Sequence, residues 1–268
     1  MQLLKVFLAA RQVFVLYTLK NKVFADISPT ALFYRGFMVV LADPDPVHLD
    51  SVPSFAAAPA LPSVLTRLRL ETRSEHEAVE RVLDLMGGLS NNSYRQRLVQ
   101  FYGFYRPLEA ALQIRCAKQS DSHSFEVLQL QKLLPRLHKS LLLRQDLHQL
   151  GITAAGLAQC RALPPIQTYA EVLGCLYVLE GATLGGRMIT QHVQATLGIT
   201  PTSGGSFFDG YAGQTARMWN ALRQTLLSAA VDAQAENAMV ASAVATFTCL
   251  RGWCASAPSP DSSVTVHD

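Results

Sequence analysis

The sequence predicts an all-α fold in which one set of helices packs into a single domain. Apolar residues recur at intervals of three and four along most of residues 63–254, as expected of helices with one buried face. Thr168 and Glu171 have capping-box spacing before a long apolar segment, which marks a helix start. No segment alternates convincingly with the period of two that a half-buried strand requires. With 268 residues, of which 49% are hydrophobic and 16% charged, the chain can bury a large core.

Three regions differ in composition. Residues 1–61 form an N-terminal extension and linker, residues 62–255 form the helical domain, and residues 256–268 are expected to be a disordered tail. Charged residues interrupt the apolar stretch 1–42, which therefore predicts no membrane span and no signal peptide. This stretch is compatible with a weak amphipathic surface segment, or with translation that starts at Met38, and we assign it no function.

The helices expected in the domain follow from apolar stripes and from punctuating Gly, Pro and Ser. The first stripe includes Leu68, Thr72, His76 and Leu83, and Gly87-Gly88 is expected to end that helix. Pro107 is expected to bend the second helix. A Gly/Ser/Pro-rich loop is expected over residues 199–210. The predicted helices span residues 63–85, 93–117, 124–134, 138–150, 169–197, 211–230 and 233–254.

Charge and cysteine content exclude several classes of function. A net charge of +3 with no dense basic run argues against nucleic-acid binding. The five cysteines form no Cys-x-x-Cys and no zinc-like cluster, so we expect them to be reduced in a cytoplasmic protein.

The segment Tyr169–Leu197 is the most informative helix because it contains four glycines. Each interior glycine costs about 1 kcal/mol of helix stability relative to alanine. Gly174, Gly181 and Gly185 are spaced by seven and four residues and therefore share one bare face, and the Gly185-Gly186 pair predicts a kink. Such a face lets a flat or bulky group approach the backbone. The alternative is close packing of a second helix against the same face.

His76 lies on the apolar stripe of the first predicted helix. Arg69, two turns earlier, lies on the same face about 10 Å away along the helix axis. A histidine and an arginine arranged in this way suit a large planar ligand that has a central metal and peripheral carboxylates. Alternatively, His76 is a core histidine that is hydrogen-bonded to a neighbour.

Several separate motifs occur in order over residues 61–252, and together they resemble the bacterial haem oxygenases, particularly those that accompany bacteriophytochromes. The motifs are Thr72-Arg-Ser-Glu-His76-Glu, Phe101-Tyr-Gly-Phe-Tyr-Arg-Pro-Leu-Glu109, Ser140-Leu-Leu-Leu-Arg-Gln-Asp-Leu147, Tyr177-Val-Leu-Glu-Gly-Ala-Thr-Leu-Gly-Gly186 and Phe207-Phe-Asp-Gly-Tyr211. The resemblance implies a helical bundle of the haem-oxygenase type that clamps haem between a proximal helix and a kinked, glycine-rich distal helix.

The resemblance also implies roles for individual residues. His76 matches the axial ligand of the haem iron, and Arg69 matches a basic residue that contacts the haem propionates. Gly181, Gly185 and Gly186 match the distal glycines, which cover the oxygen-binding side of the haem. Tyr177, one turn before Gly181, is either a polar anchor near the pocket or a core residue. Arg217 and Arg223 are further basic residues expected near the haem. Ala182 stands where many family members have an aspartate that organises water.

The reaction implied by the resemblance is oxidative cleavage of haem, which is both substrate and cofactor, to biliverdin with release of CO and ferrous iron. It consumes O₂ and needs external electrons, which we expect from a ferredoxin or a flavoprotein reductase because the chain has no GxGxxG or flavin motif. A bacteriophytochrome is the expected recipient of biliverdin.

Two other classes of function fit parts of the sequence. A haem carrier or sensor would keep His76 and lose turnover through the change at Ala182. A thiaminase-like relative would need a cysteine and a carboxylate at the centre of the bundle, and no cysteine here has an acidic partner nearby in sequence.

Overall fold

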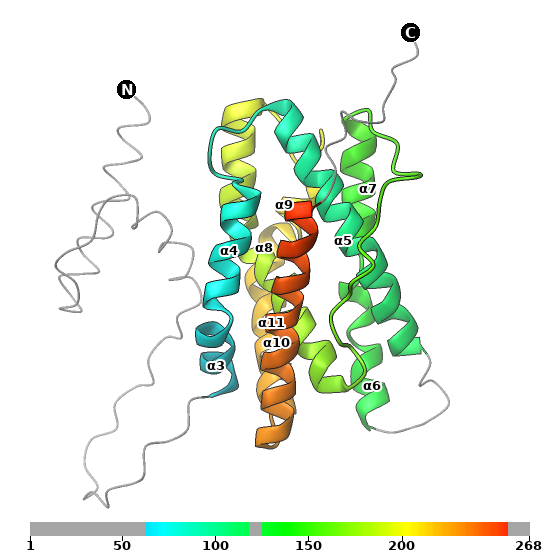
Figure 1. Cartoon of the computed structure of the whole chain (residues 1–268), viewed down its shortest axis with the longest axis vertical. Coiled ribbons are helices and arrows are strands. Elements are labelled where there is room, and N and C mark those ends of the chain that lie inside the picture. The colour runs from blue at the N-terminus through cyan, green and yellow to red at the C-terminus, as the bar shows by residue number, and fades with distance from the viewer. Residues whose placement is uncertain (1–62, 118–124, 257–268) are drawn as a thin grey trace, which may run out of the picture. The chain divides into compact units, whose positions relative to one another are not determined.

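The computed structural model describes residues 63–117 and 125–256, and within these ranges the regular structure is entirely helical (Figure 1). The predicted all-α fold is therefore confirmed, whereas the predictions for residues 1–61 and for the tail beyond residue 256 lie outside the described residues. The elements in order are α3 (Val64–Glu71), α4 (Arg73–Leu83), α5 (Asn91–Ala117), α6 (Phe125–Gln131), the 3₁₀ turn η1 (Leu134–Arg136), α7 (Lys139–Gln149), α8 (Tyr169–Leu197), α9 (Ser206–Asp209), the 3₁₀ turn η2 (Ala212–Gln214), α10 (Thr215–Ala229) and α11 (Ala233–Ser256).

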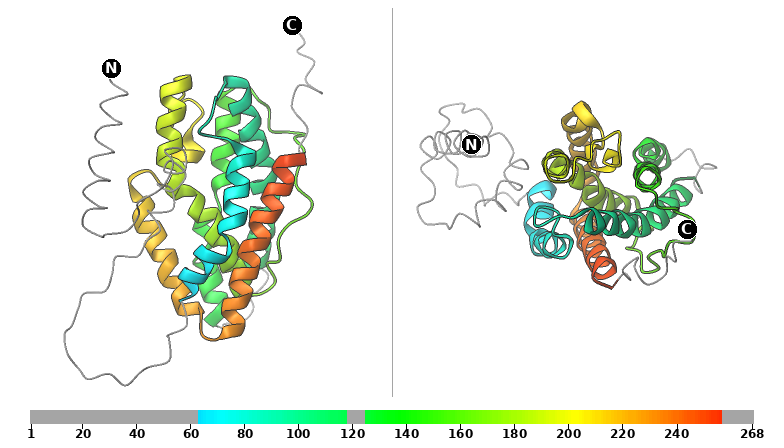
Figure 2. Two further views of the ribbon diagram at one scale, coloured as in Figure 1. Left: turned by 60° about the vertical axis from the view of Figure 1, so that its left-hand side comes forward. Right: turned by 90° about the horizontal axis from the view of Figure 1, so that it is seen from above.

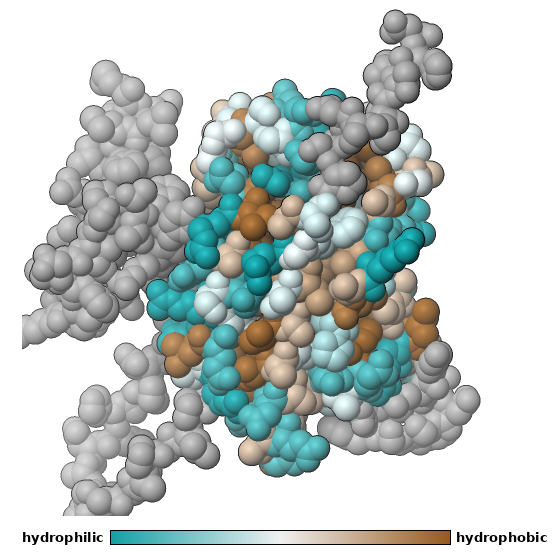
Figure 3. Space-filling view, in the orientation of Figure 1, coloured by the Kyte–Doolittle hydropathy of each residue, from teal (hydrophilic) through white to brown (hydrophobic). Residues whose placement is uncertain are grey.

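Helices α8 and α11 pack against each other, and the remaining helices are arranged around them. Helices α3 and α4 lie on one side of the bundle and α6 and α7 on the other, as the side and top views show (Figures 1 and 2). Helix α11 also packs against α3, α4 and α5, while α9 and α10 pack against α8. Both α8 and α11 are long and apolar enough to cross a membrane by length and composition alone, but each contributes many buried residues to the protein core. On the face drawn in Figure 3, hydrophobic and hydrophilic residues are interspersed.

The first predicted helix is divided in two at Thr72, which the sequence analysis did not anticipate. The buried Thr72 hydroxyl donates a hydrogen bond to the Leu68 carbonyl at 2.6 Å, and the Thr72 amide donates to the same oxygen at 3.1 Å. This local competition for one carbonyl interrupts the helix between α3 and α4. The second half ends at Asp84, which adopts a left-handed conformation with φ of 43°, and not at Gly87-Gly88 as predicted.

Buried carboxylates fix the ends of two other helices. Glu109 of α5 accepts hydrogen bonds from the amides of Lys139 and Ser140 at 2.8 and 2.9 Å, and so satisfies the first turn of α7. Asp146 of α7 accepts the amides of Ser206 and Phe207 and thereby starts α9 inside the segment predicted to be loop. Both carboxylates connect elements that are far apart in the sequence.

Helix α8 has the predicted bounds. Thr168 and Glu171 form the reciprocal capping box, with the Glu171 amide donating to Thr168 Oγ1 at 3.2 Å and the Thr168 amide donating to Glu171 Oε2 at 2.9 Å. Gly198, with φ of 71°, ends the helix as a left-handed C-cap. Figure 2 shows that α8 changes direction near its middle.

Candidate functional site

His76 lies on α4, and its ring contacts α11. The imidazole meets the ring of Phe247 edge to face at a centroid distance of 5.4 Å, and 23% of its side chain is exposed. Helices α4 and α8 both pack against α11, so the helix that carries His76 and the glycine-rich helix share one support. The imidazole is therefore a partly exposed group on a well-supported helix.

Glu80 is the acidic neighbour of His76 and was missed by the sequence analysis, although the i,i+4 spacing is visible there. Its Oε1 atom lies 3.8 Å from His76 Nδ1. Burial lowers the pKa of His76, against a smaller opposing effect of Glu77, and burial also raises the pKa of Glu80 to about 7. Burial thus favours the neutral form of the His76 imidazole, which is the form that binds iron.

Arg69 and Tyr177 come together where α3 meets α8. Burial raises the pKa of Tyr177 to about 12, while a hydrogen bond with the Thr72 side chain and the positive charge of Arg69 act in the opposite direction. The Tyr177 ring also packs against Trp219 of α10, at a centroid distance of 5.7 Å. Tyr177 is thus a buried residue whose polar end meets Thr72, between α3 and α4, and its role as an anchor near a pocket stays a prediction.

The glycines of α8 have different neighbours. A Cβ atom at Gly174 would lie 2.1 Å from the Met239 carbonyl oxygen of α11, and one at Gly186 would lie 2.0 Å from the Phe208 carbonyl oxygen of α9. Close packing of other backbones therefore accounts for the missing side chains at these two positions, and the expectation that Gly174 belongs to a face open to a ligand is wrong. A Cβ atom at Gly181 would instead have the Trp219 ring as its nearest neighbour outside the helix, at 4.0 Å. Gly181 therefore has room for a side-chain carbon, which would lie in ordinary van der Waals contact with the Trp219 ring.

The other predicted residues occupy varied positions. Gly185 is buried within α8, and Ala182 is exposed. Arg217 is exposed near the start of α10 and donates to Gln214 at 2.7 Å, whereas Arg223 is half-buried on the same helix. Because α10 packs against both α3 and α8, these arginines lie on a helix that adjoins Arg69 and Tyr177. Their contact with a ligand stays a prediction, as does that of Gly185 and Gly186.

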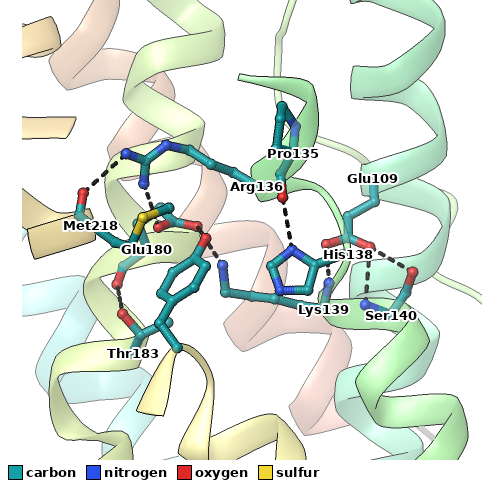
Figure 4. Close-up of polar contacts among 10 residues, drawn as sticks. Glu109, Pro135, Arg136, His138, Lys139, Ser140, Glu180, Thr183 and Met218 are labelled. Atoms are coloured by element: carbon teal, nitrogen blue, oxygen red, sulfur yellow. Dashed lines mark hydrogen bonds and ion pairs between the residues drawn. The ribbon is translucent and has the colours of Figure 1, made fainter. Parts of the chain in front are cut away.

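The largest feature missed by the sequence analysis is a buried cluster around Glu180, the residue before Gly181 (Figure 4). Glu180 is 1% exposed. Its Oε2 atom accepts a hydrogen bond from Arg136 at 2.8 Å, and its Oε1 atom accepts one from Tyr211 at 2.9 Å and also pairs with Lys139. A carboxylate in the apolar run 172–180 was the available signal, but its partners come from segments 31 to 44 residues away.

Comparison with known proteins identifies the family. The family model described as "Heme oxygenase" matches residues 63–256, which includes all the described residues. The chain belongs to the haem oxygenase family. No curated protein sequence matches it.

Solved haem oxygenase structures share the fold at low sequence identity. The NO- and CO-bound haem oxygenase from Neisseria meningitidis is 20% identical with a TM-score of 0.54, and it covers 75% of this chain and 98% of its own. The haem oxygenase from Leptospira interrogans is 20% identical with a TM-score of 0.54 over 72% of this chain and 98% of its own. Haem oxygenase 2 from Chlamydomonas reinhardtii without haem is 16% identical with a TM-score of 0.56, and the match covers 74% of this chain and 99% of that chain.

Membership of this family implies that the protein binds haem and degrades it to biliverdin, and the described residues fit that substrate. Burial favours the neutral form of the His76 imidazole by lowering its pKa, and no backbone from another helix covers Gly181 of α8. Within residues 63–117 and 125–256, no three His, Cys, Asp or Glu side chains gather in a way that could hold a bare metal ion.

Proposed function

We propose that this haem oxygenase binds haem with His76 as the axial ligand and Gly181 on the opposite side, and that this placement directs oxidation to the macrocycle. The observation that carries the proposal is the difference between two glycines of the predicted roof: a Cβ at Gly186 would meet the α9 backbone, whereas a Cβ at Gly181 would meet no backbone outside its own helix. Haem supplies the oxygen and redox chemistry when it is bound, and the residues of this chain orient it and control its surroundings.

Three residues of the proximal region have distinct tasks in this proposal. His76 would hold the iron through its imidazole, and Glu80, whose Oε1 atom lies 3.8 Å from His76 Nδ1, adds a carboxyl group beside the ring. Arg69, whose positive charge acts on Tyr177 of α8, would pair with a haem propionate. Together these contacts restrict rotation of the planar substrate about the iron–histidine axis, and that rotation decides which meso carbon is oxidised.

The distal side requires a low roof and little bulk. A side chain at Gly181 would extend toward Trp219, and in this proposal oxygen needs that region free of side chains. Ala182 provides no carboxylate, so any polar organisation of water on this side must come from backbone groups or other residues.

The His76→Ala variant tests the site. We expect it to lose the Soret band of histidine-ligated haem and most biliverdin formation, and we expect added imidazole to restore part of the spectrum. Phe247→Leu is the matched control, because it alters the packing of the imidazole and leaves the ligand in place. A His76→Ala protein with the wild-type spectrum and rate would show that the ligand lies elsewhere.

We also propose the biological setting. The five cysteines of the chain are all free thiols, and four of them are buried, which supports residence in the reducing cytoplasm. Electrons come from a ferredoxin or a flavoprotein reductase, and a bacteriophytochrome receives the biliverdin, in keeping with the resemblance of the motifs. Co-expression with a bacteriophytochrome apoprotein in a host without biliverdin tests the last point. A photochromic product supports it, and a colourless apoprotein despite active oxygenase contradicts it.

A further inference from the structure

The guanidinium group of Arg136 connects the distal helix to α10. Arg136 ends η1, and only 9% of its side chain is exposed. One terminal nitrogen donates to Glu180 Oε2 at 2.8 Å, and the other donates to the Met218 carbonyl oxygen at 3.0 Å (Figure 4). One side chain therefore holds two helices that do not follow one another in the sequence.

The two acceptors adjoin two residues that face each other, Gly181 and Trp219. Glu180 directly precedes Gly181, and Met218 directly precedes Trp219. Trp219 has the atom nearest to a Cβ at Gly181, and its ring also packs against Tyr177. Arg136 thus fixes the residues that precede Gly181 and Trp219, the two residues that face each other.

The remaining contacts of Glu180 prevent the carboxylate from moving. Its second oxygen is occupied by Lys139 and by the Tyr211 hydroxyl. Lys139 is itself held through its backbone amide by Glu109. Groups from α7 and from the segment between α9 and α10 therefore hold the carboxylate in place. As a result, the Arg136 guanidinium meets Glu180 in a single orientation.

We propose that Arg136 is a positioning residue for regiospecificity: by binding Glu180 and Met218 together, it fixes the Trp219 indole as the wall beside Gly181. This inference rests on the proposed function. The four meso carbons of haem lie at different edges of the ring, and a rigid indole next to the open backbone restricts which edge lies there. Trp219 is the specificity-determining residue that Arg136 acts through.

Arg136→Lys is the test variant because lysine keeps the positive charge but cannot donate from two separated nitrogens of a planar group. Arg67→Lys is the matched control: Arg67 also joins two helices, with bonds from α3 to Glu236 and Asn237 of α11, and does not contact this cluster. Both changes are made in a Trp253→Phe background, which leaves Trp219 as the sole tryptophan of the two in the chain.

The first measurement is acrylamide quenching of Trp219 fluorescence in the haem-free full-length protein. We expect the quenching constant to rise about twofold or more in Arg136→Lys, because the two-acceptor contact is lost, and to be unchanged in Arg67→Lys. The second measurement is the biliverdin isomer distribution by chromatography after turnover. Arg136→Lys should add a second isomer to the dominant one, and Arg67→Lys should not.

Trp219→Leu keeps the Arg136 contacts and removes the indole, so it provides a second test if Arg136→Lys does not fold. It should also broaden the isomer distribution. Unchanged quenching in folded Arg136→Lys, or a wild-type isomer distribution in either variant, overturns the inference and leaves the proposed function intact. Wild-type protein that makes no biliverdin at all would instead overturn the proposed function.

Discussion

Substitution of two neighbouring bare positions of α8 should have opposite effects on stability and on turnover. At Gly181 a new methyl group meets no heavy atom nearer than Trp219 at 4.0 Å, whereas at Gly186 it would lie 2.0 Å from the Phe208 carbonyl oxygen. The helix gains about 1 kcal/mol when an interior glycine is replaced by alanine. Gly181→Ala should therefore be as stable as the wild type or more stable by up to about that amount.

The gain at Gly186 is outweighed by overpacking. A contact of 2.0 Å with a backbone carbonyl cannot be relieved by a side-chain rotation, so α8 and α9 must move apart. Overpacked cores lose about 1–3 kcal/mol. Since 1 kcal/mol corresponds to about 2–4 °C in Tm for a domain of this size, Gly186→Ala should melt several degrees lower than Gly181→Ala.

Turnover should be affected more strongly by Gly181→Ala than by Gly186→Ala, the reverse of the order expected for stability. Gly181→Ala should bind haem stoichiometrically but make little biliverdin, because its methyl group fills space required on the distal side. Gly186→Ala should keep a greater rate per folded molecule, because its methyl group points to α9 and not to that space. The assay is calorimetric Tm and biliverdin yield on the same preparations. A Gly181→Ala protein that melts several degrees lower and cleaves haem at the wild-type rate would refute the reasoning.

Three further changes have defined outcomes. The folded-state pKa of Glu80 is raised to about 7, so the folded state binds more protons than the unfolded state and the free energy of unfolding falls as pH rises from the ordinary carboxyl range to about 7. Glu80→Gln removes this loss. Its free energy of unfolding, relative to the wild type, should rise by about 1–2 kcal/mol between pH 5 and pH 8 in denaturant titrations, a range that allows for the 27% exposure of the Glu80 side chain. A difference in stability that does not depend on pH would contradict the assignment. Glu180→Gln should lower stability by about 3–5 kcal/mol because it leaves Arg136 and Lys139 buried without their counterion, and an unchanged denaturation midpoint would show that the cluster is solvated. Deletion of residues 1–61 should leave haem affinity and turnover nearly unchanged, and insoluble or haem-free truncated protein would show that this region packs on the domain.

The sequence was sufficient for the two ends of α8, where the structural causes are local. The capping box at Thr168 and Glu171 and the glycine at position 198 determine both ends of α8, and each acts within a few residues. The break at Thr72 also has a local cause, but a threonine inside an apolar stripe does not reveal that its hydroxyl will bind the Leu68 carbonyl. The predicted helix 211–230 begins later for a similar reason, since Ala212 has φ of 49° and only a 3₁₀ turn precedes α10.

The site was predicted less completely because its contacts are long-range. Sequence spacing placed the glycines on α8 but could not separate Gly186, which faces another backbone, from Gly181, which does not. In the same way, Glu180 stood out as a charge in an apolar helix, yet its partners Arg136 and Tyr211 depend on how η1 and the segment before α10 fold against α8. Residues that act through tertiary contacts can be identified only once the structure is known.

The conversion of one equivalent of bound haem, followed by absorbance after addition of ascorbate under air, tests the central claim most directly. The account predicts that the Soret band of the wild-type complex decays while biliverdin absorbance grows and CO is released, and that His76→Ala shows neither change at a comparable rate. A wild-type complex whose Soret band persists unchanged through the reaction would contradict the account and identify the protein as a haem carrier or sensor.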